Sequence, residues 1–423
     1  MILMKTSPEV VVVGAGLAGL RCAVLLHQHG IEVLLLESQD QVGGRVRTDV
    51  INGFRLDRGF QVLQTAYPAA QRAFDYATLN LQPFPAGAYV FTQGRFQPLF
   101  DPLRHPDRLW STLRSGLLSA RDLLAMLKLN RRLDEFDLEA NPELTAPQST
   151  RAALYELGFS ESLIQRFWRP FLSGVFLETS LETRAAKFFF VMKAFREGIA
   201  ALPAEGMQAL PTQLARQLPP ESIRTQCAAV QVEANGRLHL QDGTTLTPRF
   251  TVLAVDAAAL DQLWPGHGIS LQWNCGTTVY FASENTSLEA PEALLLEGEP
   301  NAGPVATAVA LHIVAPSYVP SGAFLLTASM PGFLPDQPEQ AYQAARFQLR
   351  RWFGSVVDLW QPLGCYPIVH ALPAEPSNWQ PPQRKQLSDR VLLCGDYFGL
   401  SSIQYALAQG ERVAEHILQQ FYG

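Results

Sequence analysis

The first forty residues carry the clearest succession of strand-like and helix-like apolar patterns in the chain. Residues 10–13 are four consecutive valines, which predict a strand buried on both faces of a parallel sheet. A helix ended by Gly30 is predicted next, because apolar side chains recur at helical spacing at Leu20, Ala23, Val24 and Leu26. A second apolar run, residues 33–36, predicts a neighbouring buried strand that ends in Glu37. This order predicts the start of an α/β domain.

The turn between the first strand and the helix has the spacing GxGxxG, at Gly14, Gly16 and Gly19. In a dinucleotide-binding turn the first glycine permits the tight turn, the second lets the backbone approach a pyrophosphate, and the third lets the helix pack closely on the strand. The N-terminus of the helix adds N–H donors and partial positive charge. Glu37 can accept hydrogen bonds from both ribose hydroxyls, which disfavours a 2′-phosphate.

We therefore predict dinucleotide contacts from Val13, Gly14, Ala15, Gly16, Gly19, Glu37 and Ser38. A glycine-rich turn in an unrelated α/β protein is the alternative. The motif alone does not separate NAD from FAD.

A glycine pair and two arginines follow Glu37 in the sequence GGRVRT, residues 43–48. Gly43 and Gly44 let the backbone pass close to an extended cofactor, and Arg45 can neutralise phosphate charge. Here the sequence resembles the superfamily of flavin-containing amine oxidases, protoporphyrinogen oxidases and phytoene desaturases, which carries an acid, a short spacer and GGRxxT after its fingerprint. The resemblance implies FAD as the cofactor. A solvated loop is the alternative for Arg45 and Arg47.

Residues 53–63, GFRLDRGFQVL, look like the next element of the same superfamily. The resemblance implies that Asp57-x-Gly59 turns the chain under the flavin, with Gly59, Phe60 and Gln61 near the ring.

The C-terminal part is similar to the superfamily as well. A buried strand, residues 391–394, precedes Gly395-Asp396, and a helix is predicted from about Ser402. The resemblance implies that Gly395 and Asp396 hold the ribityl and pyrophosphate groups. It also implies that Ser402 and Ile403 present the helix N-terminus to the flavin N1–O2 edge, where a helix dipole stabilises negative charge. The small-residue pattern AQGERVAEHI predicts a helix packed on the first helix.

A central segment that begins at residue 205 resembles the part that re-enters the cofactor domain. Asn235-Gly236 and Asp242-Gly243 predict hairpin turns there, and Val230 is a predicted backbone contact of the adenine. The predicted fold class is α/β, α+β overall. A Rossmann-like FAD-binding domain (residues 1–65, 205–265 and 386–423) is interleaved with a mixed sheet-plus-helices substrate domain (66–204 and 266–385).

The first substrate-domain segment contains a helical pattern with basic residues, residues 104–132. Its predicted apolar face consists of Leu109, Leu113, Leu117, Ala120, Leu124 and Leu127. Another face carries Arg114, Arg121 and Lys128. Packing of the apolar face in the substrate domain is one interpretation; contact with an anionic membrane surface is the other.

Pocket candidates lie on a predicted strand whose alternation puts Tyr366, Ile368 and His370 on one face, where they could equally fill a core. Gln61 and Tyr405 complete the candidates. Amine oxidases commonly carry a lysine where this chain has Gly276. They also carry an aromatic residue at the position of Ser402, and a glycine at that of Tyr405. These departures weaken the case for amine oxidation, and a conspicuous acid–base pair is not evident.

Charge and composition exclude several classes of protein. The net charge is -6, which argues against a nucleic-acid partner. The five cysteines stand far apart and the histidines lack metal-ligand spacing, so reduced thiols and no metal site are expected. Neither a secretory signal nor a membrane-spanning run is predicted. We expect a cytoplasmic protein, with peripheral contact to a membrane surface as the alternative.

The sequence thus predicts an FAD-dependent oxidoreductase that removes hydride from, desaturates or isomerises an apolar or amphipathic small molecule. An isoprenoid, carotenoid or tetrapyrrole precursor is such a substrate, and the electron acceptor is oxygen or a quinone. An amine or amino-acid oxidase that releases hydrogen peroxide is one alternative. A non-catalytic flavoprotein acting as a membrane or assembly factor is the other.

Overall fold

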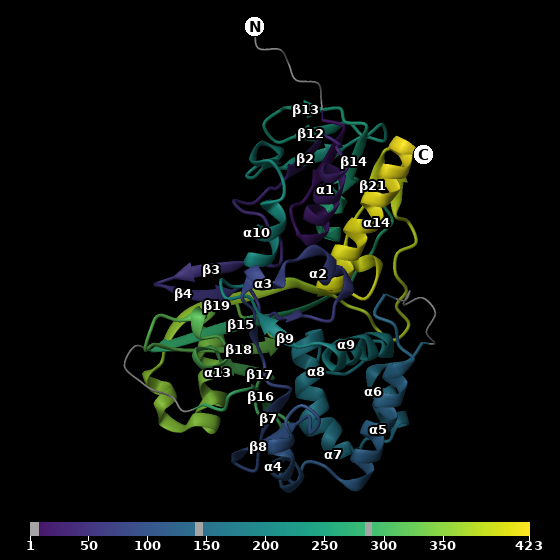
Figure 1. Ribbon diagram of the computed structural model, residues 1–423. Helices are drawn as coiled ribbons and strands as arrows, with labels where there is room; N and C mark the ends of the chain where they lie inside the picture. Colours follow the sequence, from purple (N-terminus) through teal and green to yellow (C-terminus); the bar gives the residue numbers. More distant parts are fainter. Residues whose placement is uncertain (1–7, 140–146, 284–289) are drawn as a thin grey trace.

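The computed structural model describes residues 8–139, 147–283 and 290–423. Residues 1–7 of the first predicted cofactor segment lie outside the described residues, as do 140–146 and 284–289 in the predicted substrate segments. The protein has a six-stranded sheet at one end and a seven-stranded sheet with a group of helices at the other (Figure 1). The predicted α/β fold class is confirmed.

The six-stranded sheet draws its strands from three separate parts of the sequence. Its order is β10 (Ile223–Arg224), β2 (Val33–Leu36), β1 (Val10–Val13), β14 (Phe250–Leu253), β21 (Val391–Leu393) and β20 (Gln386–Ser388). The first five strands run parallel, and β20 is antiparallel at the edge. All four residues of β1 and of β2 are buried, as their continuous apolar runs predict.

Two helices from opposite ends of the chain cover one face of this sheet. These are α1 (Leu17–Gln28) and α14 (Ile403–Tyr422), which lie side by side in Figure 1. Their backbones approach closely at Gly410, because a Cβ there would lie 2.5 Å from the carbonyl oxygen of Ala18. Arg21 and Glu411 form a buried ion pair of 2.7 Å beside this contact. The predicted packing of the C-terminal helix on the first helix is confirmed.

The other face of the six-stranded sheet packs on a small antiparallel sheet and α11 (Ala257–Leu263). The small sheet contains β11 (Ala229–Val232), β12 (Leu238–Leu240) and β13 (Thr245–Leu246). Gly236 and Gly243 have φ values of 85° and 86° in the two connections, which confirms both predicted hairpin turns.

The seven-stranded sheet has the order β19 (Gln361–Pro373), β15 (Trp273–Ser283), β18 (Phe324–Pro331), β17 (Thr307–Ala310), β16 (Leu294–Glu297), β7 (Gly87–Thr92) and β8 (Arg95–Phe100). Helix α13 (Pro338–Phe353) covers the face that carries Val279 and Phe281. The opposite face carries Thr278 and Tyr280 and meets the hairpin of β3 (Thr48–Ile51) and β4 (Phe54–Asp57). A third small sheet joins β5 (Leu63–Gln64), β9 (Ala200–Leu202) and β6 (Gln82–Pro83).

A group of helices completes the lower part of the molecule in Figure 1. It comprises α4 (Leu109–Arg114), α5 (Ala120–Asp134), α6 (Thr150–Leu157), α7 (Glu161–Leu163), α8 (Arg169–Phe176) and α9 (Ala185–Glu197). The shorter helices α2 (Pro68–Ala73), α3 (Tyr76–Leu79), α10 (Ala209–Ala215) and α12 (Leu311–Val314) lie in connections. Within the described ranges no helix has both the length and the apolar character needed to cross a bilayer.

The predicted apolar face of residues 104–132 is wrong. The pattern divides into α4 and α5, because Gly116 with a φ of 74° interrupts the helix and a capping box of Ser119 and Asp122 starts α5 anew. This break changes the rotational register, so α5 buries Ala125, Leu129 and Leu133. The residues of the predicted face that are exposed instead are Leu113, Ala120, Leu124 and Leu127.

The packing of α14 on α1 gives a prediction for stability. We expect Gly410→Val to lower the free energy of unfolding by about 2 kcal/mol, because the new side chain pushes against the backbone of α1. Urea denaturation followed by circular dichroism measures this change. The control is Glu415→Val on the exposed side of α14, which should cost less than about 1 kcal/mol. Equal losses in the two variants would contradict close backbone packing at Gly410.

Candidate functional site

The turn between β1 and α1 has space for a ligand at the middle glycine of the GxGxxG motif. A Cβ on Gly14 or Gly19 would clash with backbone oxygen atoms, of Ala254 and Gly14 respectively. At Gly16, in contrast, a Cβ would meet no atom within 4 Å. The first and third glycines are therefore required by packing, and the second leaves its backbone open. This geometry fits a turn that binds a pyrophosphate.

Glu37 lies at the end of β2 with its carboxylate fixed by neighbouring groups. One oxygen accepts a hydrogen bond from the N–H of Ala15 at 2.9 Å. The other accepts hydrogen bonds from the N–H of Gln39 at 2.9 Å and from the Ser38 hydroxyl at 3.3 Å. Each carboxylate oxygen has two lone pairs, so the oxygen bonded to Ala15 can accept one further hydrogen bond, from a ribose hydroxyl of a cofactor. The fixed carboxylate fits the predicted role of Glu37.

The GGRVRT segment lies directly beside the GxGxxG turn. The N–H of Gly43 donates to the carbonyl of Ala15 at 2.8 Å, and Gly43 pairs with Gly16 in a short parallel bridge. A Cβ on Gly44 would lie 3.3 Å from Cα of Gly16. The glycine pair thus brings a second stretch of backbone against the first, and we call the region where the two stretches meet the glycine-rich groove.

The two arginines of GGRVRT have different environments. Arg45 forms an ion pair of 2.6 Å with Asp396 and donates to the carbonyl of Ala371 at 3.3 Å. Its side chain is 38% exposed, so the guanidinium can still reach a ligand. Arg47 is buried, with 4% of its side chain exposed, and pairs with Asp40 at 3.0 Å. The structure therefore brings Arg45 and Asp396 together, and it gives Arg47 a structural position.

Segments from the centre and the C-terminus complete the groove. The N–H of Cys227 donates to the carbonyl of Glu37 at 2.8 Å, so the chain that leads to Val230 runs beside the end of β2. Val230 lies at a bulge in β11 with its side chain 46% exposed. Gly395 and Asp396 follow β21, and Ser402 caps α14 by accepting a hydrogen bond from the N–H of Tyr405. Helix α14 then begins at Ile403, which confirms the predicted start.

A buried ion pair beside the start of α14 was not predicted from the sequence. One oxygen of Glu375 accepts hydrogen bonds from Nζ of Lys187 at 2.6 Å and from the N–H of Ser401 at 2.8 Å. The other Glu375 oxygen and the Ser401 hydroxyl are buried and have no hydrogen-bond partner in the described part of the chain. Such orphaned polar atoms fit a site that receives a polar group. Neither Glu375 nor Lys187 lies in a sequence motif, so the sequence alone does not identify this ion pair.

The predicted loop near the flavin is held against the seven-stranded sheet. Gly59 has a φ of 96° and makes the predicted turn, and the N–H of Phe60 donates to the Thr278 hydroxyl at 3.3 Å. Gln61 donates to the carbonyl of Arg45 at 2.9 Å. A Cβ on Gly59 would lie 3.0 Å from Cδ1 of Ile368. The loop therefore joins the glycine-rich groove to β19.

The candidates on β19 each make a specific contact. The Tyr366 hydroxyl donates to Asp49 at 2.9 Å, and the ring of His370 stacks on Trp273 with centroids 5.0 Å apart. Burial and the neighbouring Asp49 raise the pKa of Tyr366. Val369 points the other way and is 59% exposed. Tyr366 and Ile368 share the face that meets Asp49 and Gly59, while the same face for His370 and a substrate-binding role stay predictions.

Tyr405 lies in the core and not at an open surface. It is 3% exposed, and its ring occupies the space where Gly399 would carry a side chain. It also packs edge-on against Phe190 with centroids 5.7 Å apart. Burial raises the pKa of its hydroxyl. Gly399 therefore leaves room for the Tyr405 ring inside the protein, while a pocket role for Tyr405 stays a prediction.

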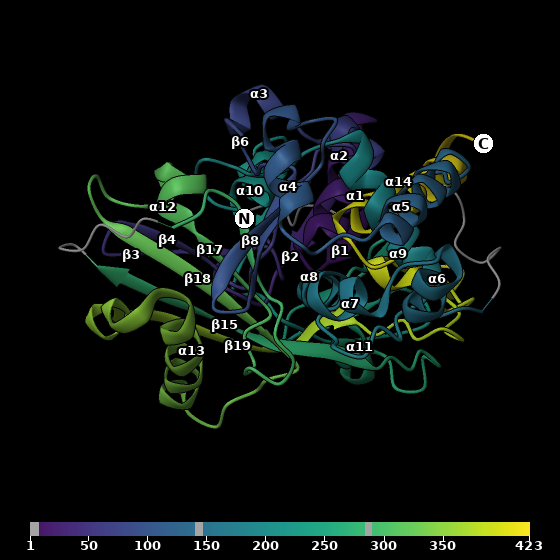
Figure 2. The same ribbon diagram turned by 90° about the horizontal axis from the view of Figure 1, so that it is seen from below.

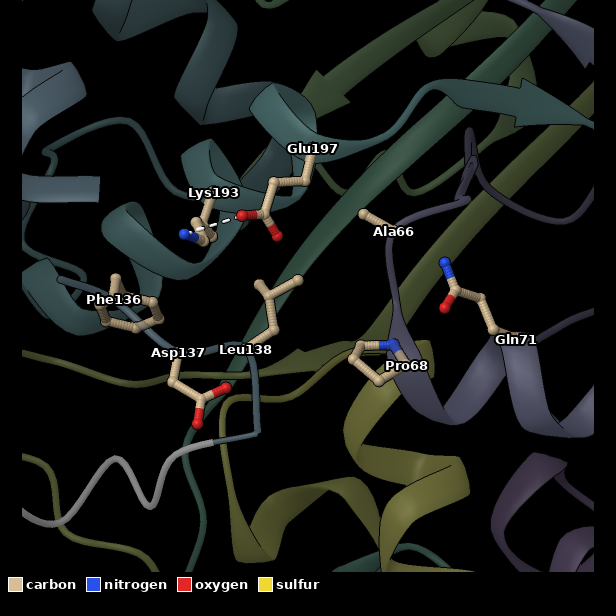
Figure 3. Close-up of a pocket in the computed structure, with 8 residues that line it drawn as sticks. All are labelled: Ala66, Pro68, Gln71, Phe136, Asp137, Leu138, Lys193 and Glu197. Atoms are coloured by element: carbon tan, nitrogen blue, oxygen red, sulfur yellow. Dashed lines mark ion pairs between the residues drawn. The ribbon is translucent and has the colours of Figure 1, made fainter. Parts of the chain in front are cut away.

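A cavity of about 510 Å³ lies elsewhere, between the start of α2 and the end of α9 (Figure 3). Its polar residues include Lys193, which pairs with Glu197 at 2.8 Å and donates to the carbonyl of Leu133. None of the predicted site residues lines this cavity. It is therefore distinct from the glycine-rich groove.

Asp57 connects the loop at Gly59 to the rest of the protein. Its buried carboxylate accepts hydrogen bonds from the Thr48 hydroxyl at 2.5 Å, the Met207 N–H at 3.0 Å and the Tyr318 hydroxyl at 2.9 Å. The Tyr280 hydroxyl donates to its carbonyl. Burial raises the pKa of Asp57 to about 6.

Comparison with known families identifies the class of protein. A family model for flavin containing amine oxidoreductases matches residues 17–418. The chain belongs to this family. The predicted resemblance, the FAD cofactor and the oxidoreductase class are therefore confirmed. The open backbone at Gly16 and the fixed carboxylate of Glu37 fit this cofactor.

Individual relatives in the family differ in what they act on. Polyamine oxidase 2 of Arabidopsis thaliana is 47% identical over 57 residues, which are 13% of this chain and 12% of the relative. Coproporphyrinogen III oxidase of Propionibacterium freudenreichii subsp. freudenreichii is 26% identical over 177 residues, 40% of this chain and 32% of the relative. The matches thus span about a third or less of these relatives.

Solved structures share the fold along the whole chain. Cyclohexylamine oxidase from Brevibacterium oxydans IH-35A has a TM-score of 0.74 at 15% identity and covers 99% of this chain and 100% of its own. Reduced UDP-galactopyranose mutase has a TM-score of 0.69 at 16% identity, with coverage of 98% and 96%. At these identities the likeness shows the fold alone.

The carboxylate at the end of β2 gives a prediction for cofactor affinity. We expect Glu37→Gln to weaken FAD binding by about 10- to 100-fold, because charge-assisted hydrogen bonds to the ribose are lost. Titration of flavin-free protein with FAD, followed by quenching of flavin fluorescence, measures the dissociation constant. Glu32→Gln, an exposed residue just before β2, is the matched control and should leave it unchanged. Equal affinities of all three proteins would contradict this role.

The raised pKa of Asp57 gives a prediction for pH dependence. Below pH 3.8, the ordinary pKa, Asp57 is protonated in both the folded and the unfolded state. As the pH rises from 3.8 to about 6, ionisation of Asp57 stabilises the unfolded state but not the folded state. We therefore expect wild type to lose up to about 3 kcal/mol of stability relative to Asp57→Asn across this interval.

Denaturant unfolding at a series of pH values measures this difference. Asp389→Asn, at an exposed position, is the control and should follow the wild-type profile. A constant difference between wild type and Asp57→Asn from acid to neutral pH would show that burial does not shift this carboxyl group.

Proposed function

We propose that this flavin-containing oxidoreductase removes hydride from, desaturates or isomerises an apolar or amphipathic small molecule. An isoprenoid, carotenoid or tetrapyrrole precursor fits this description. Oxygen or a quinone serves as the electron acceptor, and the protein is cytoplasmic or lies at a membrane surface. FAD, when bound, supplies the hydride acceptor, so the protein has to supply orientation and a dry site.

The observation that carries the proposal is the chemistry around the loop at Gly59. Ile368 lies over Gly59, and Phe60 packs edge-on against Phe84 with centroids 6.1 Å apart. The nearby charged groups are already paired, since Arg58 forms an ion pair of 2.9 Å with Asp49. An apolar molecule can lie against such a surface without leaving a buried charge unpaired.

The position where amine oxidases commonly carry a lysine supports the same proposal. Gly276 lies on β15, and a Cβ there would lie 3.7 Å from Cδ2 of Leu177 and 3.2 Å from the carbonyl oxygen of Met330. The strand therefore offers an aliphatic neighbour and a backbone carbonyl at this point, and no ammonium group.

Anaerobic mixing of the FAD-loaded protein with candidate substrates tests the proposal. We expect carotenoid or tetrapyrrole precursors, delivered in detergent micelles, to bleach the visible absorption band of FAD, and a panel of amines and amino acids not to. Bleaching by amines with release of hydrogen peroxide would instead support an amine oxidase. No bleaching by any compound, no isomerised product in the extracted lipid, and no faster reoxidation of photoreduced FAD with oxygen or quinones would together support the non-catalytic flavoprotein.

A matched pair of variants on β19 tests where the substrate lies. We expect Ile368→Asp to lower kcat/KM for the apolar substrate by at least about tenfold, because a charge then faces it beside Gly59. Val369→Asp adds the same charge on the opposite, exposed side of the strand and should leave kcat/KM within about twofold. The same loss in both variants would show that the effect does not come from contact with substrate.

A further inference from the structure

Large apolar side chains are exposed on α4, α5 and the segment before them. We call this set the outer face. Its residues and their exposed fractions are Leu103 (88%), Trp110 (65%), Leu113 (41%), Leu123 (44%), Leu124 (62%) and Leu127 (65%). Isolated exposed leucines are ordinary, but apolar side chains that lie together mark an interaction surface, and helical spacing puts Leu123, Leu124 and Leu127 on one side of α5.

The outer face is not the margin of the protein core. Helix α5 buries Ala125, Leu129 and Leu133. At about 100° per residue, Leu124 and Leu127 lie on the opposite side of the helix from these residues. The helix thus has two apolar faces, of which the core uses one. The outward leucines of such a helix indicate contact with a second apolar environment outside the core.

Basic residues accompany the outer face. Residues 103–135 contain seven arginines and lysines against four aspartates and glutamates, in a chain whose net charge is -6. Within the described part of the chain, Arg114, Lys128 and Arg131 form no ion pair, and all three are exposed. Long basic side chains beside leucine and tryptophan match the requirements of an anionic lipid surface, where the cations meet headgroups and the apolar groups enter the acyl boundary.

We propose that the outer face docks the protein on an anionic phospholipid bilayer, without crossing it. Charge complementarity favours lipid over a second copy of this chain, because a symmetric contact would bring this net positive segment against an identical net positive segment. Helices α4 and α5 lie at the end of the molecule opposite the six-stranded sheet (Figures 1 and 2). Docking therefore leaves the cofactor-binding end directed away from the membrane.

Docking on a bilayer would give the enzyme access to an apolar substrate dissolved in the same bilayer. This benefit of docking rests on the proposed function, whereas the docking itself does not. Binding to lipid needs no substrate, so it is measured on the FAD-loaded protein alone. If docking fails, the proposed reaction remains testable in detergent micelles. If that reaction fails, vesicle binding remains measurable.

Sedimentation with vesicles tests the proposal. We expect the protein to bind vesicles of phosphatidylcholine with phosphatidylglycerol, and to bind vesicles of phosphatidylcholine alone at least about tenfold more weakly. The double variant Leu124→Ser, Leu127→Ser should lose at least about tenfold in binding to the anionic vesicles. Phe347→Ser on α13, where Phe347 is 75% exposed, is the matched control and should bind as wild type does.

A charge variant provides an independent readout. We expect Arg114→Gln, Lys128→Gln, Arg131→Gln to weaken binding to the anionic vesicles and to reduce its dependence on salt. Retained FAD and an unchanged thermal midpoint show that each variant folds; if the leucine variant does not fold, the charge variant decides. Unchanged binding in the folded variants would overturn the proposal. So would a concentration-dependent dimer that the same substitutions abolish, because a second copy would then cover the outer face.

Discussion

The cofactor groove depends on backbone meeting backbone at glycine residues. Gly14 lies against Ala254, Gly44 lies over Gly16, and Gly410 lies against the first turn of α1. Each contact joins segments that are far apart in the sequence. A Cβ at any of these positions would separate the segments or force them to shift, because backbone atoms cannot move aside as side chains do. The groove therefore exists only while separate segments of the chain stay in close backbone contact.

This constraint explains which parts of the protein the sequence predicts well. The glycine positions and the short buried strands are local patterns, and their physical requirements are the same in every dinucleotide-binding turn. Glu37 is predictable for a related reason, since the strand that precedes it fixes where its carboxylate lies. The same holds for Ser402, whose hydroxyl caps α14 where the helical pattern begins.

Other features depend on contacts between residues that are distant in the sequence, so local sequence patterns do not predict them. Tyr405 fits an exposed position as well as a buried one, and the space beside Gly399 accommodates its ring in the core. The pattern of residues 104–132 fits one long amphipathic helix until the break at Gly116 rotates α5 about its axis. Glu375 and Lys187 lie 188 residues apart and resemble any surface charges until the fold buries both.

The pairing of Glu375 and Lys187 has an electrostatic consequence for the groove. A carboxylate next to the start of a helix is stabilised by the partial positive charge there, and it also reduces the attraction of that helix for another anion. Lys187 offsets the charge of Glu375 at 2.6 Å. The pair as a whole is then close to neutral, so the N-terminal dipole of α14 remains available to a ligand. An isolated buried carboxylate at the same place would oppose negative charge on that ligand, which is why a buried lysine here favours an anion-stabilising site.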